Sequence, residues 1–438
     1  MLLKKTFYYL ILTTLLLASC QKSGVAPKEN LEAPSSDDAK SAEQERESLD
    51  ESSKIDPEEN KDPLPKDPPE EEKEVSGLKP GAFLRVAGSH TFEAGTKEDS
   101  EHTQWTISVG EAESLNETPQ KLRILDTAQG QRFSYDLKAA ALQGKFTFYR
   151  VEVKGRGFAD TKDMILLDPK SMHRLLFKSK DSKTLRVYFK VPPKLTPASK
   201  LLFVFHGKNR NADEYCAMWE SYPQASDTVV ICPEFNERDW DGSSAYNLGN
   251  LFSSVSAEGR TGSLHPESQW SFTVVEHLYQ WAKEAFAFSN KDFDAWGHSA
   301  GGQFVHRLAL FKPNLPYRYV IPANPGWWTV GDLETVFPYG VNHPMLAVEN
   351  KDLLSFSLKN LVIMRGTKDN DPRASGLRRN DIVDAQQGDN RFERAGHFFN
   401  TGGKIHEKSP WQLIDVPGVG HEGDKMAAAA MGFLKDNR

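Results

Sequence analysis

The sequence predicts a protein of the α/β class whose main sheet is largely parallel and covered by helices on both faces. From residue 183 to residue 438, apolar strand-like segments alternate with helix-like segments, and a glycine-rich turn joins one strand to the helix after it. Such alternation is typical of parallel sheets, because a helix packed on the sheet makes each return crossing. A region with β-strand patterns precedes it, so we expect two folded domains in the 438 residues.

The C-terminal domain, residues 183–438, contains short apolar runs rich in β-branched and aromatic residues, which favour extended structure. Other segments repeat apolar residues at helical spacing. The predicted strands are Leu185–Val191, Leu201–Phe205, Thr228–Cys232, Phe293–Trp296, Tyr319–Ile321, Leu361–Met364 and Gln412–Val416. The predicted helices are Trp270–Phe286, Val305–Phe311 and Lys425–Leu434.

The preceding region, residues 77–168, has runs of β-forming residues that turn signals separate at short intervals. This pattern predicts a small all-β sandwich of the immunoglobulin or fibronectin type. Its role stays open between a spacer and a ligand-binding module. The strand-like runs are residues 83–86, 105–109, 121–125, 131–135 and 146–153.

Residues 1–19 have the features of an export signal. Two lysines precede an apolar run from Phe7 to Leu17, which is too short to cross a bilayer as a helix. The run ends in the tetrapeptide LASC, which resembles the lipobox of bacterial lipoproteins and implies lipidation of Cys20. By the same resemblance, Gln21 in place of aspartate favours the outer membrane, on its periplasmic or surface side. The alternative is an ordinary secretory signal followed by a chance cysteine.

Residues 20–76 predict a disordered tether. Between residues 21 and 75 the chain has 18 acidic and 8 basic residues and no aromatic ones. Such a segment cannot bury enough apolar surface to offset the entropy lost on ordering. The whole chain has a net charge of −7, so the part after the tether is nearly neutral. We therefore expect no nucleic-acid partner, which would require a basic face.

The turn at residues 297–302, GHSAGG, has the pattern G-x-S-x-G and lies between a predicted strand and a predicted helix. In that context the pattern predicts a nucleophile elbow, a strained turn that exposes a serine hydroxyl. The glycines two positions before and after Ser299 leave room for the bend. Ser299 is therefore the candidate nucleophile; the alternative is a tight structural turn.

A serine nucleophile needs a base and an acid that orients the base. His421 follows the last predicted strand on a glycine-rich loop, and we expect it to be the base. Asp369 follows the strand at Leu361–Met364 and is the expected acid, with Asp371 as the alternative. The order Ser, Asp, His along the chain is that of the α/β-hydrolase fold. The alternatives are a surface-loop histidine at position 421 and a turn-capping aspartate at position 369 or 371.

The oxyanion of an acyl-transfer intermediate needs backbone N–H donors. One should belong to Ala300, which follows the nucleophile. The other should come from the loop after the strand Leu201–Phe205, from Lys208 or Gly207. No group of histidines, cysteines and carboxylates has the spacing of metal ligands, so we expect no metal and no organic cofactor.

Three further features leave alternatives open. Cys216 and Cys232 remain after Cys20. Export would place them in an oxidising space, where they form a disulfide or stay as two buried thiols, and the sequence favours neither. Trp327 and Trp328 line a substrate pocket or pack a loop. The polar segment 386–394 is a lid or a support for the loop of the acid.

The region from Leu201 to the C-terminus resembles bacterial α/β-hydrolases of the polyhydroxybutyrate depolymerase and feruloyl-esterase-like group. The matching segments are HGKNRNADEY from residue 206, CPEF from residue 232, the GHSAGG turn and GVGH ending at His421. The resemblance implies a Ser-Asp-His triad, no metal, and ester substrates from small acyl esters to polymers. No dedicated polymer-binding domain is recognisable, and Lys208 leaves the acyl specificity open.

Together these features predict a serine hydrolase outside the cytoplasm that cleaves carboxylic esters, anchored to the membrane by its N-terminal lipid. A serine peptidase or amidase with the same triad is the second hypothesis. The third is a binding lipoprotein on an inactive hydrolase scaffold. The physiological substrate, protein partners and oligomeric state are not encoded in any recognisable pattern.

Overall fold

The computed structural model describes residues 74–76, 84–87, 90–95, 102–112, 121–130, 132–137, 146–155, 158–180 and 183–437. The predicted export signal, Cys20 and all of the predicted tether except its last three residues lie outside this part of the chain. Within it, no helix has the length and the apolar character that crossing a bilayer requires.

The main sheet confirms the predicted α/β-hydrolase fold. Its strand order is β1-β9-β10-β12-β11-β13-β14-β15-β16, and every neighbouring pair from β12 to β16 is parallel. Strand β10 pairs antiparallel with β9 and β12. The bounds are β1 Glu74–Ser76, β9 His173–Lys178, β10 Thr184–Lys190, β11 Lys200–Phe205, β12 Thr228–Glu234, β13 Phe293–His298, β14 Tyr317–Ala323, β15 Val362–Gly366 and β16 Gln412–Val416.

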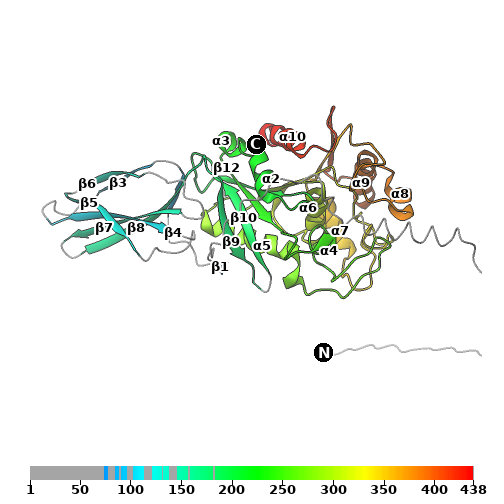
Figure 1. Cartoon of the computed structure of the whole chain (residues 1–438), viewed down its shortest axis with the longest axis horizontal. Coiled ribbons are helices and arrows are strands. Elements are labelled where there is room, and N and C mark those ends of the chain that lie inside the picture. Colours follow the sequence, from blue (N-terminus) through cyan, green and yellow to red (C-terminus); the bar gives the residue numbers. More distant parts are fainter. Residues whose placement is uncertain are drawn as a thin grey trace, which may run out of the picture. The chain divides into compact units, whose positions relative to one another are not determined.

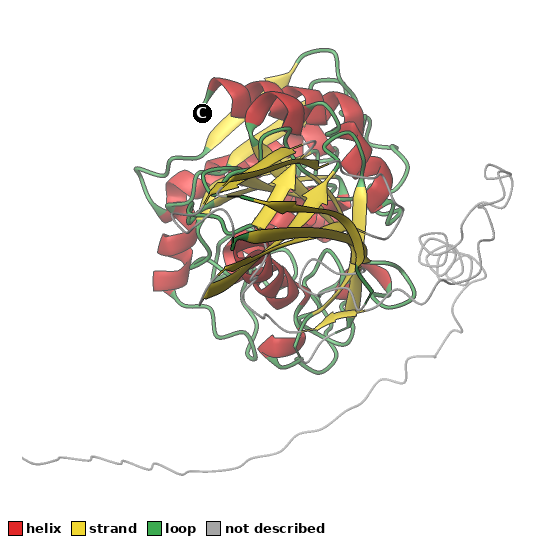
Figure 2. Cartoon of the chain, turned by 90° about the vertical axis from the view of Figure 1, so that its left-hand side faces the viewer, coloured by secondary structure: helices red, strands yellow, loops and turns green. Residues whose placement is uncertain are grey.

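Alternating side chains on the central strands bury both faces of this sheet. In β11, Leu202 and Val204 join one apolar cluster, while Leu201, Phe203 and Phe205 join the other. Helices cover both faces, so the central strands are apolar in nearly every position (Figures 1 and 2). One face receives α2 Ala212–Met218, α3 Tyr222–Ser226 and α10 Gly423–Asp436. The other receives α5 Ser271–Ala285, α6 Ala300–Phe311, α7 Asn350–Ser357 and α9 Arg391–Ile405.

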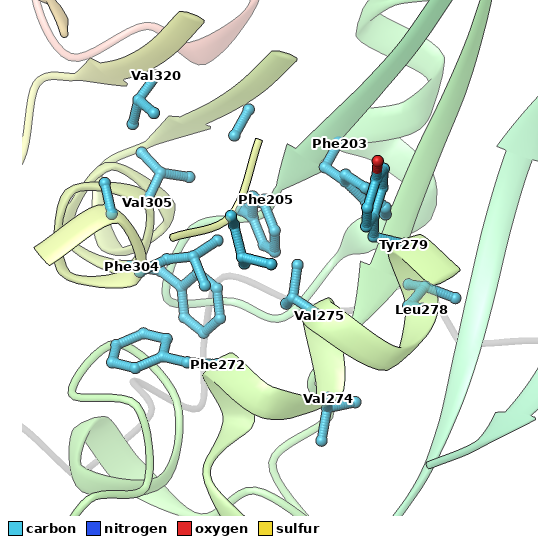
Figure 3. Close-up of a cluster of buried hydrophobic side chains, with 14 of the residues drawn as sticks. Phe203, Phe205, Phe272, Val274, Val275, Leu278, Tyr279, Phe304, Val305 and Val320 are labelled. Carbon is cyan, nitrogen blue, oxygen red and sulfur yellow. The ribbon is translucent and has the colours of Figure 1, made fainter. Parts of the chain in front are cut away.

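The cluster on the α5–α6 face surrounds the strand that precedes the predicted oxyanion loop. Phe205 of β11 stacks on Phe304 of α6 with ring centroids 4.7 Å apart. Phe272 of α5 contacts the same ring edge to face at 5.1 Å. Figure 3 shows Val275 of α5 beside these rings. The packing ties helix α6, which begins directly after Ser299, to the strand β11.

Among the described residues between β1 and β9, strands are the only regular secondary structure. Strand β1 itself is formed by the last three residues of the predicted disordered tether, and it pairs with β9 of the main sheet. Five strands form one sheet in the order β2-β8-β7-β4-β5, and β3 pairs with β6. The boundaries of this domain and its likeness to immunoglobulin or fibronectin modules stay predictions. The bounds are β2 Leu84–Ala87, β3 His90–Gly95, β4 Gln104–Ala112, β5 Arg123–Gln129, β6 Arg132–Leu137, β7 Phe146–Gly155 and β8 Phe158–Leu167.

Strand β9 was not predicted, and it precedes residue 183, where we expected the C-terminal domain to begin. It alternates buried and half-exposed residues and pairs with β10 from Lys178–Thr184 to His173–Phe189. Charged residues alternate with apolar ones in β9 because the strand lies near the edge of the main sheet, where one row of side chains is partly exposed. A sheet can therefore recruit a strand whose own sequence is only weakly apolar.

Replacing Phe304 by alanine should lower the free energy of unfolding by about 3–5 kcal/mol, because the ring is fully buried among aromatic neighbours. Urea unfolding followed by tryptophan fluorescence measures the change. Leu358→Ala is the matched control, since that side chain is 50% exposed and should lose less than about 1 kcal/mol. Equal losses in the two variants would contradict the packing described here.

Candidate active site

Ser299 occupies the bend between β13 and α6. Its φ of 56° and ψ of −117° lie in a region that side-chain-bearing residues rarely adopt. Such a conformation typically costs about 1–3 kcal/mol and persists only where the surroundings enforce it. Here the Ser299 N–H donates to the carbonyl of Ala323 at 2.9 Å, and the Ser299 carbonyl accepts the N–H of Gln303 at 3.0 Å. These bonds hold the serine at the end of the sheet with its side chain partly exposed.

Two glycines make this bend sterically feasible. A Cβ on Gly297 would collide with the carbonyl of Gly301. A Cβ on Gly301 would collide with the carbonyls of Phe205 and His206. The room that the two glycines leave on either side of Ser299 is therefore filled by backbone. The first turn of α6 is pressed against the end of β11, which carries the predicted oxyanion loop.

The structure brings Ser299, His421 and Asp369 together from three separate loops. His421 Nε2 lies 3.0 Å from Ser299 Oγ, and His421 Nδ1 lies 2.6 Å from Asp369 Oδ2. Asp369 is buried, whereas His421 is partly exposed. The alternative acid, Asp371, does not reach the histidine. Its carboxylate is exposed and accepts the N–H of Arg373 at 2.8 Å.

Backbone contacts hold the loops of the acid and the base side by side. The N–H of Lys368 donates to the carbonyl of Val419 at 2.8 Å, and that of Thr367 donates to Val416 at 3.1 Å. A Cβ on Gly366 would lie only 2.5 Å from the Val419 carbonyl, so this approach requires glycine. The two loops therefore behave as one support for the pair Asp369 and His421.

Asn324 links the same loops from the end of β14, a role that the sequence analysis did not assign. Its side-chain amide donates to the carbonyl of Gly420 at 2.8 Å, and its side-chain oxygen accepts the N–H of Gly366 at 2.8 Å. The residue has a φ of 46°, a conformation that asparagine tolerates better than most residues. An asparagine shortly after a predicted apolar strand was the signal that the sequence offered for it.

The candidate oxyanion donors lie where α6 and β11 meet. Ala300 is the first residue of α6, so its N–H has no acceptor within the helix. Of the two alternatives in the β11 loop, Gly207 lies against the Tyr215 hydroxyl, and a Cβ there would approach this hydroxyl to 2.7 Å and Ser299 Cβ to 3.9 Å. Lys208 and Gly207 both stay candidates for the second donor. The Lys208 side chain is exposed and lies beside Gly376.

The side chains of His206 and Tyr246 bond to the backbone of the loop after β11. His206 is fully buried; its Nδ1 lies 2.9 Å from the Gly207 carbonyl, and its Nε2 accepts the N–H of Phe235 at 3.1 Å. Burial lowers the pKa of His206 to about 3, so the ring is neutral. The Tyr246 hydroxyl donates to the His206 carbonyl at 2.7 Å. His206 is thus structural, as the Nδ1 and Nε2 contacts use both ring nitrogens.

His298, directly before the nucleophile, packs its ring against that of His421 with centroids 4.6 Å apart. The Tyr215 hydroxyl lies 3.0 Å from His298 Nδ1. Burial lowers the pKa of His298 well below its usual value, and repulsion from His421 and Arg391 adds to the effect. The ring that packs against the candidate base His421 is therefore neutral.

Cys216 of α2 and Cys232 of β12 form a disulfide, which decides an alternative that the sequence left open. The two tryptophans, in contrast, are buried. Trp328 stacks on Phe398 at 4.1 Å, and Trp327 lies under the guanidinium of Arg307. Both belong to the main apolar cluster, so they pack the interior and do not form an open pocket wall.

The polar segment 386–394 supports the loop of the acid. It spans the end of α8 Asp381–Gln387 and the first turn of α9. The Phe392 N–H donates to the Asp369 carbonyl at 3.1 Å, and Arg391 Nη1 lies 3.4 Å from Asp369 Oδ1. Of the two roles considered for this segment, the contacts are those of a support.

This fold, with a serine elbow facing a histidine and a buried aspartate, defines the class of α/β-hydrolases. Poly(aspartic acid) hydrolase-1 from Sphingomonas sp. KT-1 is 32% identical, over 61% of this chain and 100% of that protein, with a TM-score of 0.57. A poly(3-hydroxybutyrate) depolymerase from Bordetella parapertussis is 26% identical, over 61% and 90%, with a TM-score of 0.55.

The chain belongs to the polyhydroxybutyrate depolymerase-like family of α/β-hydrolases, as the resemblance of its motifs implied, and it is a hydrolase. No protein-family model matches the chain, and no curated protein sequence matches it. The assignment therefore rests on solved structures.

Gly301→Ala should reduce activity on a p-nitrophenyl ester by about 100-fold or more and lower the melting temperature. The new Cβ would push α6 away from β11, and shifts near 1 Å have such effects on catalysis. Gly432→Ala is the matched control in helix α10, where a Cβ meets nothing within 4 Å. It should keep full activity and gain up to about 1 kcal/mol of stability. A fully active Gly301→Ala would contradict the tight contact.

Proposed function

We propose that the protein is a serine hydrolase that cleaves carboxylic esters outside the cytoplasm through an acyl-enzyme. The observation that carries the proposal is the continuous contact from Ser299 Oγ to His421 Nε2 and from His421 Nδ1 to Asp369 Oδ2. Nucleophile, base and orienting acid lie at the hydrogen-bonding distances that acyl transfer requires. A binding scaffold has no need of a strained serine in this setting.

In the proposed first step, His421 Nε2 takes the proton of Ser299 while the Ser299 oxygen attacks the acyl carbon. Asp369 keeps the Nδ1 proton in place and stabilises the imidazolium that forms. The imidazolium then gives its proton to the departing alkoxide, which leaves as the alcohol. His421 is thereby returned to its neutral form, and the acyl group stays on Ser299.

The N–H groups of Ala300 and Lys208 stabilise the oxyanion of each tetrahedral intermediate. Removing one such donor typically reduces kcat by about 100- to 1000-fold. In the second step a water molecule loses its proton to His421 and attacks the acyl-enzyme. Collapse of this intermediate breaks the bond to Ser299, which recovers its proton, and releases the carboxylic acid.

The second candidate is an amidase or peptidase with the same residues. One observation favours it: the 32% identical protein is named a poly(aspartic acid) hydrolase, and poly(aspartic acid) is a polyamide with a carboxylate on each unit. The exposed Lys208 beside the proposed oxyanion donors is compatible with a negatively charged substrate. The ester proposal keeps precedence, since an activated serine cleaves esters more readily than amides.

The proposed location is the outer membrane, with a lipid on Cys20 and the acidic segment after it leading to the folded part. The support comes from the LASC tetrapeptide after an apolar run of export-signal length. The disulfide between Cys216 and Cys232 is compatible with an oxidising compartment outside the cytoplasm.

Ser299→Ala should give a folded protein with at least about 1000-fold lower esterase activity, because the attacking oxygen is gone. The measurement combines p-nitrophenyl butyrate turnover with labelling by a fluorophosphonate probe and a thermal melt. The wild type should be labelled and the variant should not. An unlabelled, folded wild-type protein would favour an inactive scaffold instead.

The ester and amide hypotheses separate when p-nitrophenyl esters and matched p-nitroanilides are assayed side by side. We expect turnover of the ester with no measurable turnover of the anilide, and loss of the ester activity in Ser299→Ala. Poly(3-hydroxybutyrate) and poly(aspartic acid) serve as the polymeric pair. Release of aspartate oligomers without ester turnover would reverse the order of the two candidates.

A further inference from the structure

We propose that Arg391 is a positioning residue that holds the carboxylate of Asp369 toward His421 and, through its charge, makes the base easier to keep neutral. The inference rests on the proposed function, because it assigns a role to a neighbour of the proposed triad. It concerns a residue that the sequence analysis left inside a polar segment of undecided role.

The contacts of Arg391 divide the Asp369 carboxylate between two partners. Asp369 Oδ2 accepts from His421 at 2.6 Å, and Asp369 Oδ1 faces Arg391 Nη1 at 3.4 Å. With one oxygen held on each side, the carboxylate cannot rotate without losing its contact to the arginine or to the histidine. Arg391 Nη2 also donates to the carbonyl of Ser375 at 3.1 Å, which closes the loop that follows the acid.

Burial strengthens the attraction between the Arg391 and Asp369 charges. The Arg391 and Asp369 side chains are only 3% and 4% exposed, so water screens their interaction weakly. Burial lowers the pKa of Arg391, and the neighbouring Asp369 charge opposes that shift. The guanidinium stays protonated, as arginine does in proteins. A fixed positive charge therefore lies behind the carboxylate that faces the base.

The contact of the Arg391 guanidinium with Asp369 leaves one of its nitrogen atoms without a hydrogen bond among the described residues. Arg391 Nε is buried and has no hydrogen-bond partner within the described part of the chain. Arg394, one turn further along α9, uses its guanidinium fully for packing: it bonds the carbonyls of Gly388 and Gly326 and the carboxylate of Asp384. The two arginines are equally buried, and only Arg391 touches the acid.

Other charged or titratable groups surround the pair at the end of the sheet. The neutral His298 packs against His421 from β13. On the loop of the base, Glu422 is paired with Lys425, and both are largely exposed. On the loop of the acid, exposed Asp371 faces Arg373. Lys208 lies beside Gly376 of the same loop.

Among these groups, Arg391 alone combines burial with direct contact to the acid in the described residues. Its charge offsets part of the negative field of Asp369 at the imidazole. Without it, protonation of His421 becomes easier, and a larger fraction of the enzyme has an inactive base at mildly acidic pH. The acidic limb of kcat/KM, which reports the free enzyme, should therefore move to higher pH.

The test compares full-length wild type, Arg391→Gln and Arg391→Lys in the pH dependence of p-nitrophenyl butyrate hydrolysis. In Arg391→Gln, the acidic limb of kcat/KM should shift to higher pH by about 0.5–1 unit. The plateau kcat should fall about 10-fold with little change in KM. In Arg391→Lys, the retained charge should leave the limb in place while kcat still falls. Arg394→Gln, the matched control, should lower the melting temperature without moving the limb.

A limb that stays in place or moves to lower pH in Arg391→Gln would overturn the inference. If that variant does not fold, Arg391→Lys decides, because an unchanged kcat there would also overturn it. The rate of inactivation by a fluorophosphonate, measured across pH, checks the limb without the deacylation step. Absence of both turnover and labelling in the wild type would instead refute the proposed function itself.

Discussion

The bend at Ser299 is the constraint on which the site depends. A residue with a side chain is held at a φ of 56° because backbone fills the space on both sides of it. The carbonyls of Phe205 and His206 press on Gly301, so the first turn of α6 cannot relax. The same contact brings the N–H of Ala300 close to the loop that holds Lys208. One packing arrangement thus sets both the nucleophile and its candidate oxyanion donors.

The remaining groups converge because parallel strands end at one edge of the sheet. Asp369 follows β15 and His421 follows β16, and these strands are neighbours. Asn324, after β14, bonds the backbone of both loops and so fixes their spacing. The glycine at position 366 lets the loop of the base approach within backbone contact. The distances of 2.6 and 3.0 Å at His421 follow from this shared support.

The charged groups in direct contact with the acid and beside the base are buried. His298 is kept neutral by burial, so it adds no positive charge beside His421. Arg391 is the buried cation and Asp369 the buried anion of the described site. The family relationship explains why a hydrolytic site lies at this edge, but it leaves the identity of the scissile bond to experiment. The relatives include both a polyester depolymerase and a poly(aspartic acid) hydrolase.

Local patterns were sufficient to predict the α/β fold, most central strands, and the loops that carry Ser299, His421 and the two candidate aspartates, because strand and turn signals act over a few neighbours. Strand β9 was missed, since a strand near the edge of a sheet needs little apolar pattern of its own. The choice of Asp369 over Asp371, the disulfide, the burial of Trp327 and Trp328, and the contact of Arg391 with the acid were decided only by the tertiary structure. These features join residues distant in the chain, and burial and close contact exist only once the sheet and its helices have packed.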